Sequence, residues 1–417
     1  MLTEAKKFKE TEIGFIPEGW GVFRLGDLTE KIIDNRGKTP PVSDSGYELI
    51  ETFQISIEKK YPDLSNKGKQ KYVSEETYNS WFRAGHPQKG DILFSTVGAS
   101  IPQWCFIPED AKYCVAQNLI GLRLNKIVSP EFLRAFFNTP FFKSQVNGIV
   151  ITTAQPSIKV PHLLDLKIVV PPLDEQVRLA DIIVSIEDKI ELNRKVNANL
   201  ETLVGSLFKE WFASTRDKLP EGWKLGKVSD LIKVESGFPF NSNMFDESGQ
   251  YKLITIKNVQ DGYFISECTN SLSKIPSKMP AHCLLKDGDI LLSLTGNVGR
   301  ICLVNGENYL LNQRVAKLIP INEDDRAFVY FLFRQKDFQN ILTSISRGTA
   351  QQNLSPIETK SLEIVVPSKE ALSRFARVAN PIFQMVVENY NQITNLSILR
   401  DSLLPRLMSG RIRTKPQ

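Results

Sequence analysis

Several short motifs in this chain of 417 residues contain residue types that enzymes use for chemistry. Gly37-Lys38-Thr39 matches the end of a phosphate-binding loop, but Ile32 occupies the position of the first glycine that such a loop requires. Asp63, Asp110 and Lys112 supply the residue types of a nuclease metal site, but they are far apart in the sequence and nothing else supports them. We therefore interpret both motifs as chance matches.

The sequence also lacks the motifs of a cofactor-dependent enzyme. Pro171-Pro172 has neither the preceding Asn or Asp nor the following aromatic residue of an amino-methyltransferase loop, and no glycine-rich loop follows a first strand. The five cysteines form no C-x-x-C pair, their odd number argues against a disulfide framework, and the three histidines are scattered. We therefore expect the chain by itself to bind no S-adenosylmethionine, no ATP, no metal and no other cofactor.

The composition is that of an ordinary globular protein with two or three domains. Hydrophobic residues make up 41% of the chain and charged residues 24%, so disorder is not expected. The formal net charge of +5 permits a polyanionic partner. Residues 1–12 contain no apolar segment typical of a signal peptide, and no apolar run reaches the length of a membrane span. These features predict a cytoplasmic protein that does not enter a membrane.

Five passages occur twice in the same order, with an offset of 196 to 203 residues. Because the offset changes only between the passages, the chain is two copies of one plan, a globular block followed by a long helix. A period this long indicates a duplicated pair of domains rather than a solenoid. The passages are Pro-Glu-Gly-Trp at 17–20 and 220–223, Gly-Asp-Ile-Leu-x-Ser at 90–95 and 288–293, Gln117 and Gln313, Thr-Ala-Gln at 153–155 and 349–351, and Leu-x-Ile-Val-Val-Pro at 166–171 and 362–367.

Each copy ends in a segment of about forty residues whose apolar residues follow a seven-residue rhythm. Because the two helices follow homologous blocks, we expect them to pack antiparallel about an approximate two-fold axis. At 1.5 Å per residue they would form a rod of roughly 60 Å that holds the blocks apart, with buried Asn residues fixing the register. In the alternative, each helix packs only on its own domain. The expected contact positions are Ile186, Ile190, Asn193, Asn197, Leu200, Val204, Leu207 and Trp211, and Val386, Asn389, Ile393, Leu396, Arg400, Leu403 and Leu407.

The ordered set of repeated motifs, with Asp174-Glu175-Gln176 after the first Val-Val-Pro and the heptad helices, resembles the specificity subunit of Type I restriction-modification systems over nearly the whole chain. In the second copy, Ser368-Lys369-Glu370-Ala371 departs from the family pattern, so that helix start is expected to dock its partner differently. We expect an α+β fold in which a curved or partly closed sheet forms the core of each block. The domains would be target recognition domains at 1–172 and 218–367, and antiparallel coiled-coil helices at 173–217 and 368–417.

This resemblance implies a non-catalytic, DNA-binding subunit in which each block recognises one half of a split double-stranded target. Two methyltransferase subunits would bind the helices and supply S-adenosylmethionine for adenine methylation, and translocating restriction subunits would join them for cleavage. Two other classes of function stay open from the residues. One is a stand-alone modification or restriction enzyme, which the missing motifs weaken, and the other is a protein-interaction scaffold with no DNA role.

Candidate DNA contacts lie in basic and polar loops. A lysine-rich stretch with interleaved tyrosines suits phosphate contact, although a solvated loop would have the same composition. Arg pairs naturally with guanine, and Asn or Gln with adenine, although the Thr-Ala-Gln shared by both halves argues partly for a structural role. The basic tail at 406–417 could contact DNA or a partner, or be a frayed end. The candidates are Lys59, Lys60, Lys67, Lys69, Lys71, Tyr72, Gln155, Lys252, Lys257, Asn258, Arg347, Gln351 and Asn353.

Overall fold

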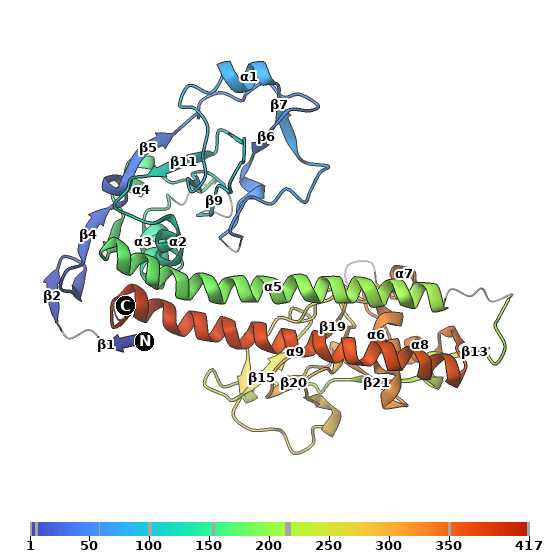
Figure 1. Cartoon of the computed structure of the whole chain (residues 1–417). Coiled ribbons are helices and arrows are strands. Elements are labelled where there is room, and N and C mark those ends of the chain that lie inside the picture. The colour runs from blue at the N-terminus through green and yellow to red at the C-terminus, as the bar shows by residue number, and fades with distance from the viewer. Residues whose placement is uncertain are drawn as a thin grey trace. The chain divides into compact units, whose positions relative to one another are not determined.

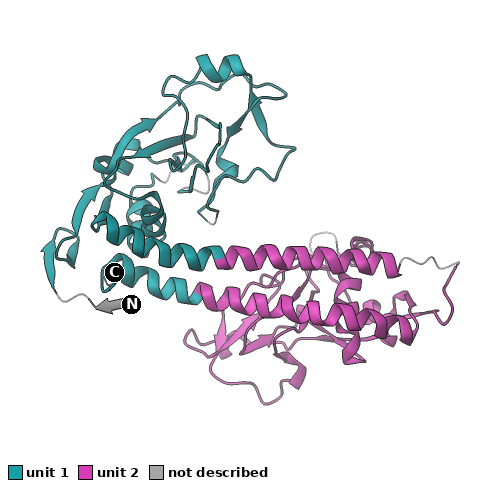
Figure 2. Cartoon of the chain, in the orientation of Figure 1, with its two compact units in different colours: residues 1–188, 398–417 teal, residues 189–397 magenta. Residues whose placement is uncertain are grey.

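A computed structural model of the chain describes residues 2–4, 7–57, 59–98, 102–151, 155–212, 218–348 and 352–414. The chain divides into two compact units, one formed by residues 1–188 with 398–417 and the other by residues 189–397 (Figure 2). Both boundaries fall inside long helices, so the division into four domains stays a prediction. No described helix is long and apolar enough to cross a membrane.

Among its described residues, the first unit has two main sheets and four short α-helices, whose arrangement Figure 1 shows. One sheet has the order β5-β11-β8-β9 and the other has the order β10-β6-β7. Its strands are β1 (Leu2–Glu4), β2 (Phe8–Thr11), β3 (Gly14–Pro17), β4 (Gly21–Arg24), β5 (Thr29–Ile33), β6 (Tyr47–Ile50), β7 (Lys71–Val73), β8 (Ile92–Ser95), β9 (Trp104–Phe106), β10 (Cys114–Val115), β11 (Leu119–Leu124), β12 (Lys167–Val170) and β23 (Ile412–Thr414). Its short helices are α1 (Glu75–Ser80), α2 (Pro130–Phe137), α3 (Pro140–Gly148) and α4 (Val160–Leu164).

The second unit repeats this topology, which confirms the predicted duplication of an α+β block. Its sheets have the orders β14-β21-β18-β19 and β16-β15-β20-β17, so β17 is the one addition to the two main sheets. The strands are β13 (Lys224–Lys227), β14 (Ile232–Ser236), β15 (Tyr251–Ile254), β16 (Ser271–Leu272), β17 (Leu284–Leu285), β18 (Ile290–Ser293), β19 (Ile301–Leu303), β20 (Tyr309–Leu311), β21 (Val315–Pro320) and β22 (Glu363–Val366). The short helices are α6 (Arg326–Arg334), α7 (Lys336–Ser344) and α8 (Pro356–Ser361). The strands of each block form several small sheets, whereas the sequence analysis expected a single curved or partly closed sheet within the α+β block.

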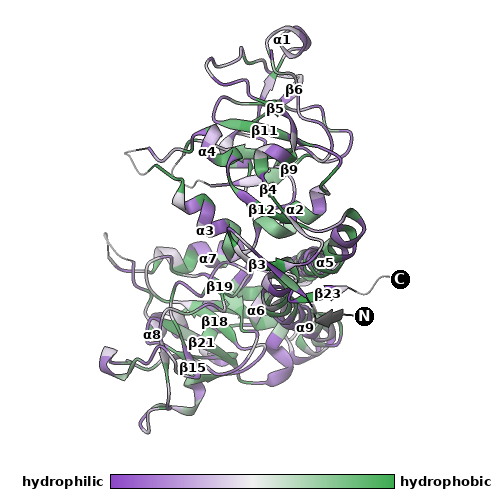
Figure 3. Ribbon diagram, turned by 90° about the vertical axis from the view of Figure 1, so that its left-hand side faces the viewer, coloured by the Kyte–Doolittle hydropathy of each residue, from purple (hydrophilic) through white to green (hydrophobic). Residues whose placement is uncertain are grey.

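The repeated Val-Val-Pro passage closes each block at its end. β12 pairs antiparallel with β4, which follows the first Pro-Glu-Gly-Trp, and β22 pairs in the same way with β13. The central strands β8 and β18 are buried along their whole length, because short continuous apolar runs favour strands covered on both faces. Figure 3 shows the hydrophobic residues of the sheets in green. The first and last strands of each block are therefore neighbours.

Helices α5 (Leu173–Phe212) and α9 (Lys369–Met408) pack against each other and run antiparallel (Figure 1). In the first unit, Leu179 and Ile183 of α5 share a core with Leu404 and Leu407 of α9. In the second unit, the core contains Val204 and Phe208 of α5 together with Phe375, Ala379 and Val386 of α9. Early residues of α5 thus meet late residues of α9, which confirms the predicted antiparallel packing.

The predicted asparagines form a buried set of hydrogen bonds between the helices in the second unit. Asn197 is 2% exposed, and its Nδ2 donates to the carbonyl of Val386 at 3.1 Å while its Oδ1 accepts from Asn389 Nδ2 at 2.8 Å. Asn193 Nδ2 donates to Gln392 Oε1 at 3.1 Å. A buried amide that lost these partners would cost free energy, so the bonds favour one helix register.

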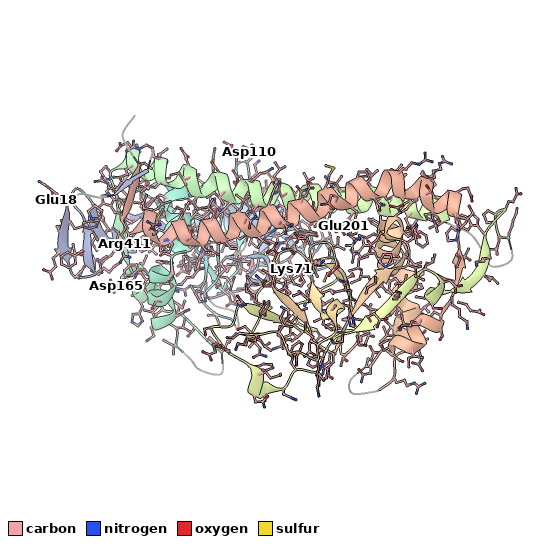
Figure 4. The ribbon with its side chains drawn as sticks, turned by 90° about the horizontal axis from the view of Figure 1, so that it is seen from below. Glu18, Lys71, Asp110, Asp165, Glu201 and Arg411 are labelled. Atoms are coloured by element: carbon pink, nitrogen blue, oxygen red, sulfur yellow. The ribbon has the colours of Figure 1, made fainter. Side chains whose placement is uncertain are left out.

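Glu201 of α5 joins the second block to the helices (Figure 4). The hydroxyls of Tyr330 in α6 and Tyr390 in α9 lie 3.3 and 3.4 Å from its Oε1, and Arg334 Nη2 lies 3.5 Å from its Oε2. Burial raises the pKa of Glu201, and the Arg334 guanidinium partly opposes this shift. Arg334 also pairs with Asp261 at 2.5 Å, so one polar network connects both helices, α6 and a loop of the sheet.

Glu175 has the corresponding role in the first unit, and its side chain is 3% exposed. Its carboxylate accepts from Trp20 Nε1 at 3.0 Å and from Arg413 Nε and Nη2 at 2.8 and 2.6 Å. Arg413 lies in β23, which pairs with β1. The basic tail is therefore paired with β1 up to Thr414, and the Arg413 guanidinium is bound to the Glu175 carboxylate. Lys415 lies outside the described residues.

Different residues hold the start of α9, and the expectation that this helix start docks a partner subunit differently stays a prediction. In the first unit, Gln176 Oε1 accepts from Ser129 N, and its Nε2 donates to the carbonyls of Ile127 and Pro171. Leu372 occupies the equivalent position in α9, and Asn380, two turns later, provides the corresponding bonds. Its Oδ1 accepts from Ala327 N at 3.3 Å, and its Nδ2 donates to the Asp324 carbonyl at 2.8 Å.

Replacing Glu175 with Ala should lower the free energy of unfolding of the first unit by about 2 to 3 kcal/mol, because Trp20 and Arg413 lose their shared acceptor. The control is Glu370→Ala at the exposed start of α9, which should change stability much less, because solvent screens this carboxylate. Hydrogen exchange of residues 17–24 and 405–414 measures the difference. Equal protection in the two variants would contradict the assigned role of Glu175.

Candidate nucleic-acid interface

The lysine-rich stretch forms the connection between β6 and β7 and the start of β7 in the first unit. Lys59 pairs with Asp63 at 2.5 Å and Lys71 pairs with Glu51 at 2.9 Å. The hydrogen bond from Lys59 holds the pKa of Asp63 below its usual range. The ammonium group of Lys60 lies 5.3 Å from the centre of the Tyr61 ring.

The remaining lysines of this stretch carry unopposed positive charge. Lys67 and Lys69 are exposed, and neither forms an ion pair with the residues that the structure describes. Tyr72 is half-buried in β7, opposite Glu48 of β6. The structure thus brings Lys59, Lys60, Lys67, Lys69, Lys71 and Tyr72 onto one connection. Such a surface can bind phosphate groups, with release of counterions.

The equivalent connection in the second unit, between β15 and β16, has a different character. Lys252 in β15 and Lys257 in the loop are exposed. Asn258 is 3% exposed, its Nδ2 donates to the carbonyls of Ile265 and Glu267 at 2.8 Å, and its Oδ1 accepts from Thr255 N and Oγ1 at 2.9 and 3.0 Å. Because all of these bonds hold the loop itself, the Asn258 amide has no free edge for a base, and we remove this residue from the candidates.

The polar loop after α7 forms a second basic surface in this unit. The Arg347 side chain is 82% exposed and pairs with Glu358 of α8. Arg347 and Asn353 exchange two backbone hydrogen bonds of 2.8 Å, and Asn353 Oδ1 accepts from Thr295 Oγ1 at 2.6 Å. Both residues line a shallow, open hollow with Ile357, whose side chain is 76% exposed. The exposed Arg347 guanidinium has N–H donors that point to solvent. The Asn353 side-chain oxygen, in contrast, already accepts a hydrogen bond from Thr295 within the loop.

The corresponding loop of the first unit has the same backbone form. Ile151 and Ser157 pair as Arg347 and Asn353 do. Gln155 is exposed at this loop. Gln351, its predicted counterpart, lies outside the described residues. Gln155, Arg347 and Asn353 therefore lie on equivalent loops of the two blocks. Gln155 does not lie on the β6–β7 connection of the first unit, and Arg347 and Asn353 do not lie on the β15–β16 connection of the second unit.

The repeated Gly-Asp-Ile-Leu-x-Ser motif is a turn followed by a strand, as its sequence indicated. Gly90 and Gly288 have φ angles of 80° and 75°, which favour glycine. Asp91 pairs with Arg123 at 2.9 Å, and the equivalent Asp289 pairs with Lys317 at 2.7 Å. The hydroxyls of Ser95 and Ser293 accept hydrogen bonds from the backbone amides of Gln103 and Arg300. The motif therefore maintains the fold.

Two exposed tyrosines were not among the DNA-contact residues predicted from the sequence. Tyr61 is 40% exposed and Tyr263 is 53% exposed, and they lie on the equivalent connections β6–β7 and β15–β16. Exposed aromatic rings beside lysines can stack on bases or sugars. An alignment of the two copies across this connection would have found Tyr263, but the connection contains no repeated motif to guide it.

The described residues contain no group of three or more His, Cys, Asp or Glu side chains that could hold a metal ion. The five cysteines are free, with four buried and Cys268 half-buried. Burial raises the pKa of Cys268 to about 11 and that of Cys114 to about 12, which disfavours the thiolate that a metal would need.

Comparison with known proteins agrees with this architecture. The family model of the Type I restriction modification DNA specificity domain matches residues 17–202 and 220–394. The HindI specificity subunit of Haemophilus influenzae is 25% identical over 402 residues, covering 78% of this chain and 87% of the relative. The MjaIX specificity subunit of Methanocaldococcus jannaschii is 25% identical over 435 residues, covering 98% and 97%. The S subunit of a Type I system from M. genitalium shares the fold, with a TM-score of 0.53, 16% identity, and coverage of 95% and 97%.

The chain belongs to the Type I restriction-modification DNA specificity family, because that family's model matches most of both halves. It is the DNA target-specificity subunit of such a system, the non-catalytic component, with two target recognition domains.

Replacing Asn258 with Ala should lower the free energy of unfolding of the second unit by about 2 to 3 kcal/mol, because several buried hydrogen-bond partners are left unpaired. The control is Lys257→Ala at the exposed neighbouring position, which should change stability by no more than about 0.5 kcal/mol. Denaturant titration measures both variants. Unchanged stability of Asn258→Ala with an altered base preference would restore Asn258 as a base contact.

Proposed function

We propose that the chain directs a Type I complex to a bipartite double-stranded DNA target, with each block reading one part. The observation that carries this proposal is the duplication of the block itself. Both copies keep the order of the strands that they share, with β17 added in the second, while their exposed connections differ in charge and residue type. Two similar scaffolds with different loops are suited to two different half-sites on one polymer.

Within each block, phosphate binding and base reading fall to different residues. The exposed Lys59, Lys67, Lys69 and Lys71 would bind phosphates at the first half-site, supported by Lys60 and Tyr72, and Lys252 and Lys257 would do so at the second. Gln155, Arg347 and Asn353 lie on the polar loops and have the donors and acceptors that base edges require, and we propose the same role for Gln351 from its residue type alone.

Helices α5 and α9 are the proposed spacer and the docking site for partner subunits. Both helices expose apolar side chains that single coiled-coil packing does not cover, and such exposure favours association with another protein. Two methyltransferase subunits would bind here and supply S-adenosylmethionine for adenine methylation, and restriction subunits with translocase activity would join the complex in the cytoplasm. The exposed residues are Leu173, Val177, Leu192 and Leu203 in α5, and Val378, Met385, Ile398 and Leu399 in α9.

Exchanging residues 220–366 for the matching block of a relative with another target should change only one half of the recognised sequence. The exchanged segment includes both β13 and β22, so the strand pair that closes the block moves as one piece. Sequencing of methylated sites in cells that express the hybrid with its partner subunits gives the result. The reciprocal exchange of residues 17–170 is the matched control and should change the other half. A change in both halves from one exchange would overturn independent reading.

A further inference from the structure

The connections that follow β6 and β15 begin with the same turn, although none of its four residues is the same in the two units. Glu51 N donates to Gln54 Oε1 at 2.9 Å, and Thr255 N donates to Asn258 Oδ1 at 2.9 Å. Both amide residues are buried, with exposures of 2% and 3%. The backbone carbonyl of each also accepts a hydrogen bond from the returning chain, of 2.7 Å in the first unit and 2.9 Å in the second. The turns from Glu51 to Gln54 and from Thr255 to Asn258 are therefore equivalent.

Each of these turns presents one exposed side chain. Phe53 is 49% exposed, and Lys257 occupies the equivalent position and is also exposed. The residues on either side of each are buried or half-buried, so the turn holds this one side chain toward solvent. Because Lys257 is a candidate DNA contact, Phe53 occupies the corresponding position in the first unit.

The surroundings of Phe53 are basic. Lys71 pairs with Glu51 of the same turn at 2.9 Å. The side chain of Gln54 donates to Gln70 Oε1 at 2.6 Å, and this bond ties the turn to the end of the lysine-rich stretch. A polyanion attracted by these lysines therefore meets the exposed phenyl ring.

The fold of the first unit does not require the Phe53 ring. Among the described residues, Phe53 belongs to none of the apolar clusters of this unit. A single exposed apolar side chain is common on protein surfaces, so exposure alone indicates no ligand. Phe53 differs because a buried amide fixes its turn and because the surface around it is basic. Burial of the ring against a ligand would remove its apolar surface from water, which is favourable.

We infer that Phe53 reads a thymine in the first half-site by packing against its 5-methyl group. A phenyl ring has no hydrogen-bond donor or acceptor, and the thymine methyl is the apolar group that the major groove presents. Lys257 at the equivalent position can donate to guanine or to phosphate, so the two turns suit different half-sites. This inference rests on the proposed function and names a specificity-determining residue of the first block.

The test measures binding of the reconstituted complex to duplexes that carry the sequence found by methylation mapping. Each thymine of the half-site that block exchange assigns to the first block is replaced in turn by uracil, which lacks the methyl group. One of these replacements should weaken binding by about 4-fold, because one methyl group is no longer buried. Phe53→Ala should weaken binding by about 10-fold, and the same replacement should then have no further effect. Phe53→Leu keeps an apolar side chain and should keep part of the uracil effect.

Phe15→Ala is the matched control, since Phe15 is 69% exposed and lies in β3, outside the lysine-rich connection. It should leave both the affinity and the uracil effect unchanged. Equal uracil effects in the wild type and in Phe53→Ala would overturn the inference, as would the absence of any uracil effect in the first half-site. Dissociation of the methyltransferase subunits from the Phe53→Ala complex would also overturn it and assign Phe53 to subunit docking. A wild-type complex that fails to bind the mapped sequence would instead refute the proposed function, and this inference with it.

Discussion

The buried amides between α5 and α9 constrain the second unit more strongly than any apolar contact of the same helices. An apolar seam with a seven-residue repeat tolerates a shift of one heptad, because Leu, Ile and Val can exchange places at modest cost. Asn197 cannot make that shift without losing both the Val386 carbonyl and Asn389. An unpaired buried amide would cost free energy, and this cost selects one register of α5 and α9 in the second unit.

Each block is also fixed to its helices by a buried polar group, and the two copies have reached this result with different residues. In the first unit, Glu175 joins Trp20 to Arg413 of the C-terminal strand. In the second unit, the network around Glu201 connects α5, α6 and α9. Since a charge that is removed from water needs partners on every side, each network ties several elements together at once. The two copies of the fold thus attach a block to the helices through different residues, as long as a buried carboxylate keeps hydrogen-bond partners on several elements.

The sequence predicted the features that depend on pattern alone. The duplicated motifs predicted two equivalent blocks, and the heptad spacing predicted both helices and the asparagines between them. The sequence did not predict the hydrogen-bond and ion-pair partners of side chains in loops. Asn258 looked like a base contact beside Lys257, but its amide closes the loop onto residues seven and nine positions later. For the basic tail that contains Arg413, the sequence left open a DNA contact, a partner contact or a frayed end, but Arg413 pairs with Glu175, which lies 238 positions earlier in the chain. Such partners are distant or irregular in sequence, so no local rule identifies them.

We propose that the paired helices set the distance between the two recognised half-sites. One heptad added to each helix, between Asp188 and Lys189 and between Ser397 and Ile398, falls at the boundaries of the two units and keeps the apolar repeat. It lengthens the helix pair by about 10 Å at 1.5 Å per residue, which equals about three base pairs of DNA. The added pairs also rotate one half-site by about 100°, so we expect some loss of affinity. Sequencing of the methylated sites should show a spacer about three base pairs longer between unchanged half-sites. An unchanged spacer, or altered bases in either half-site, would contradict the account.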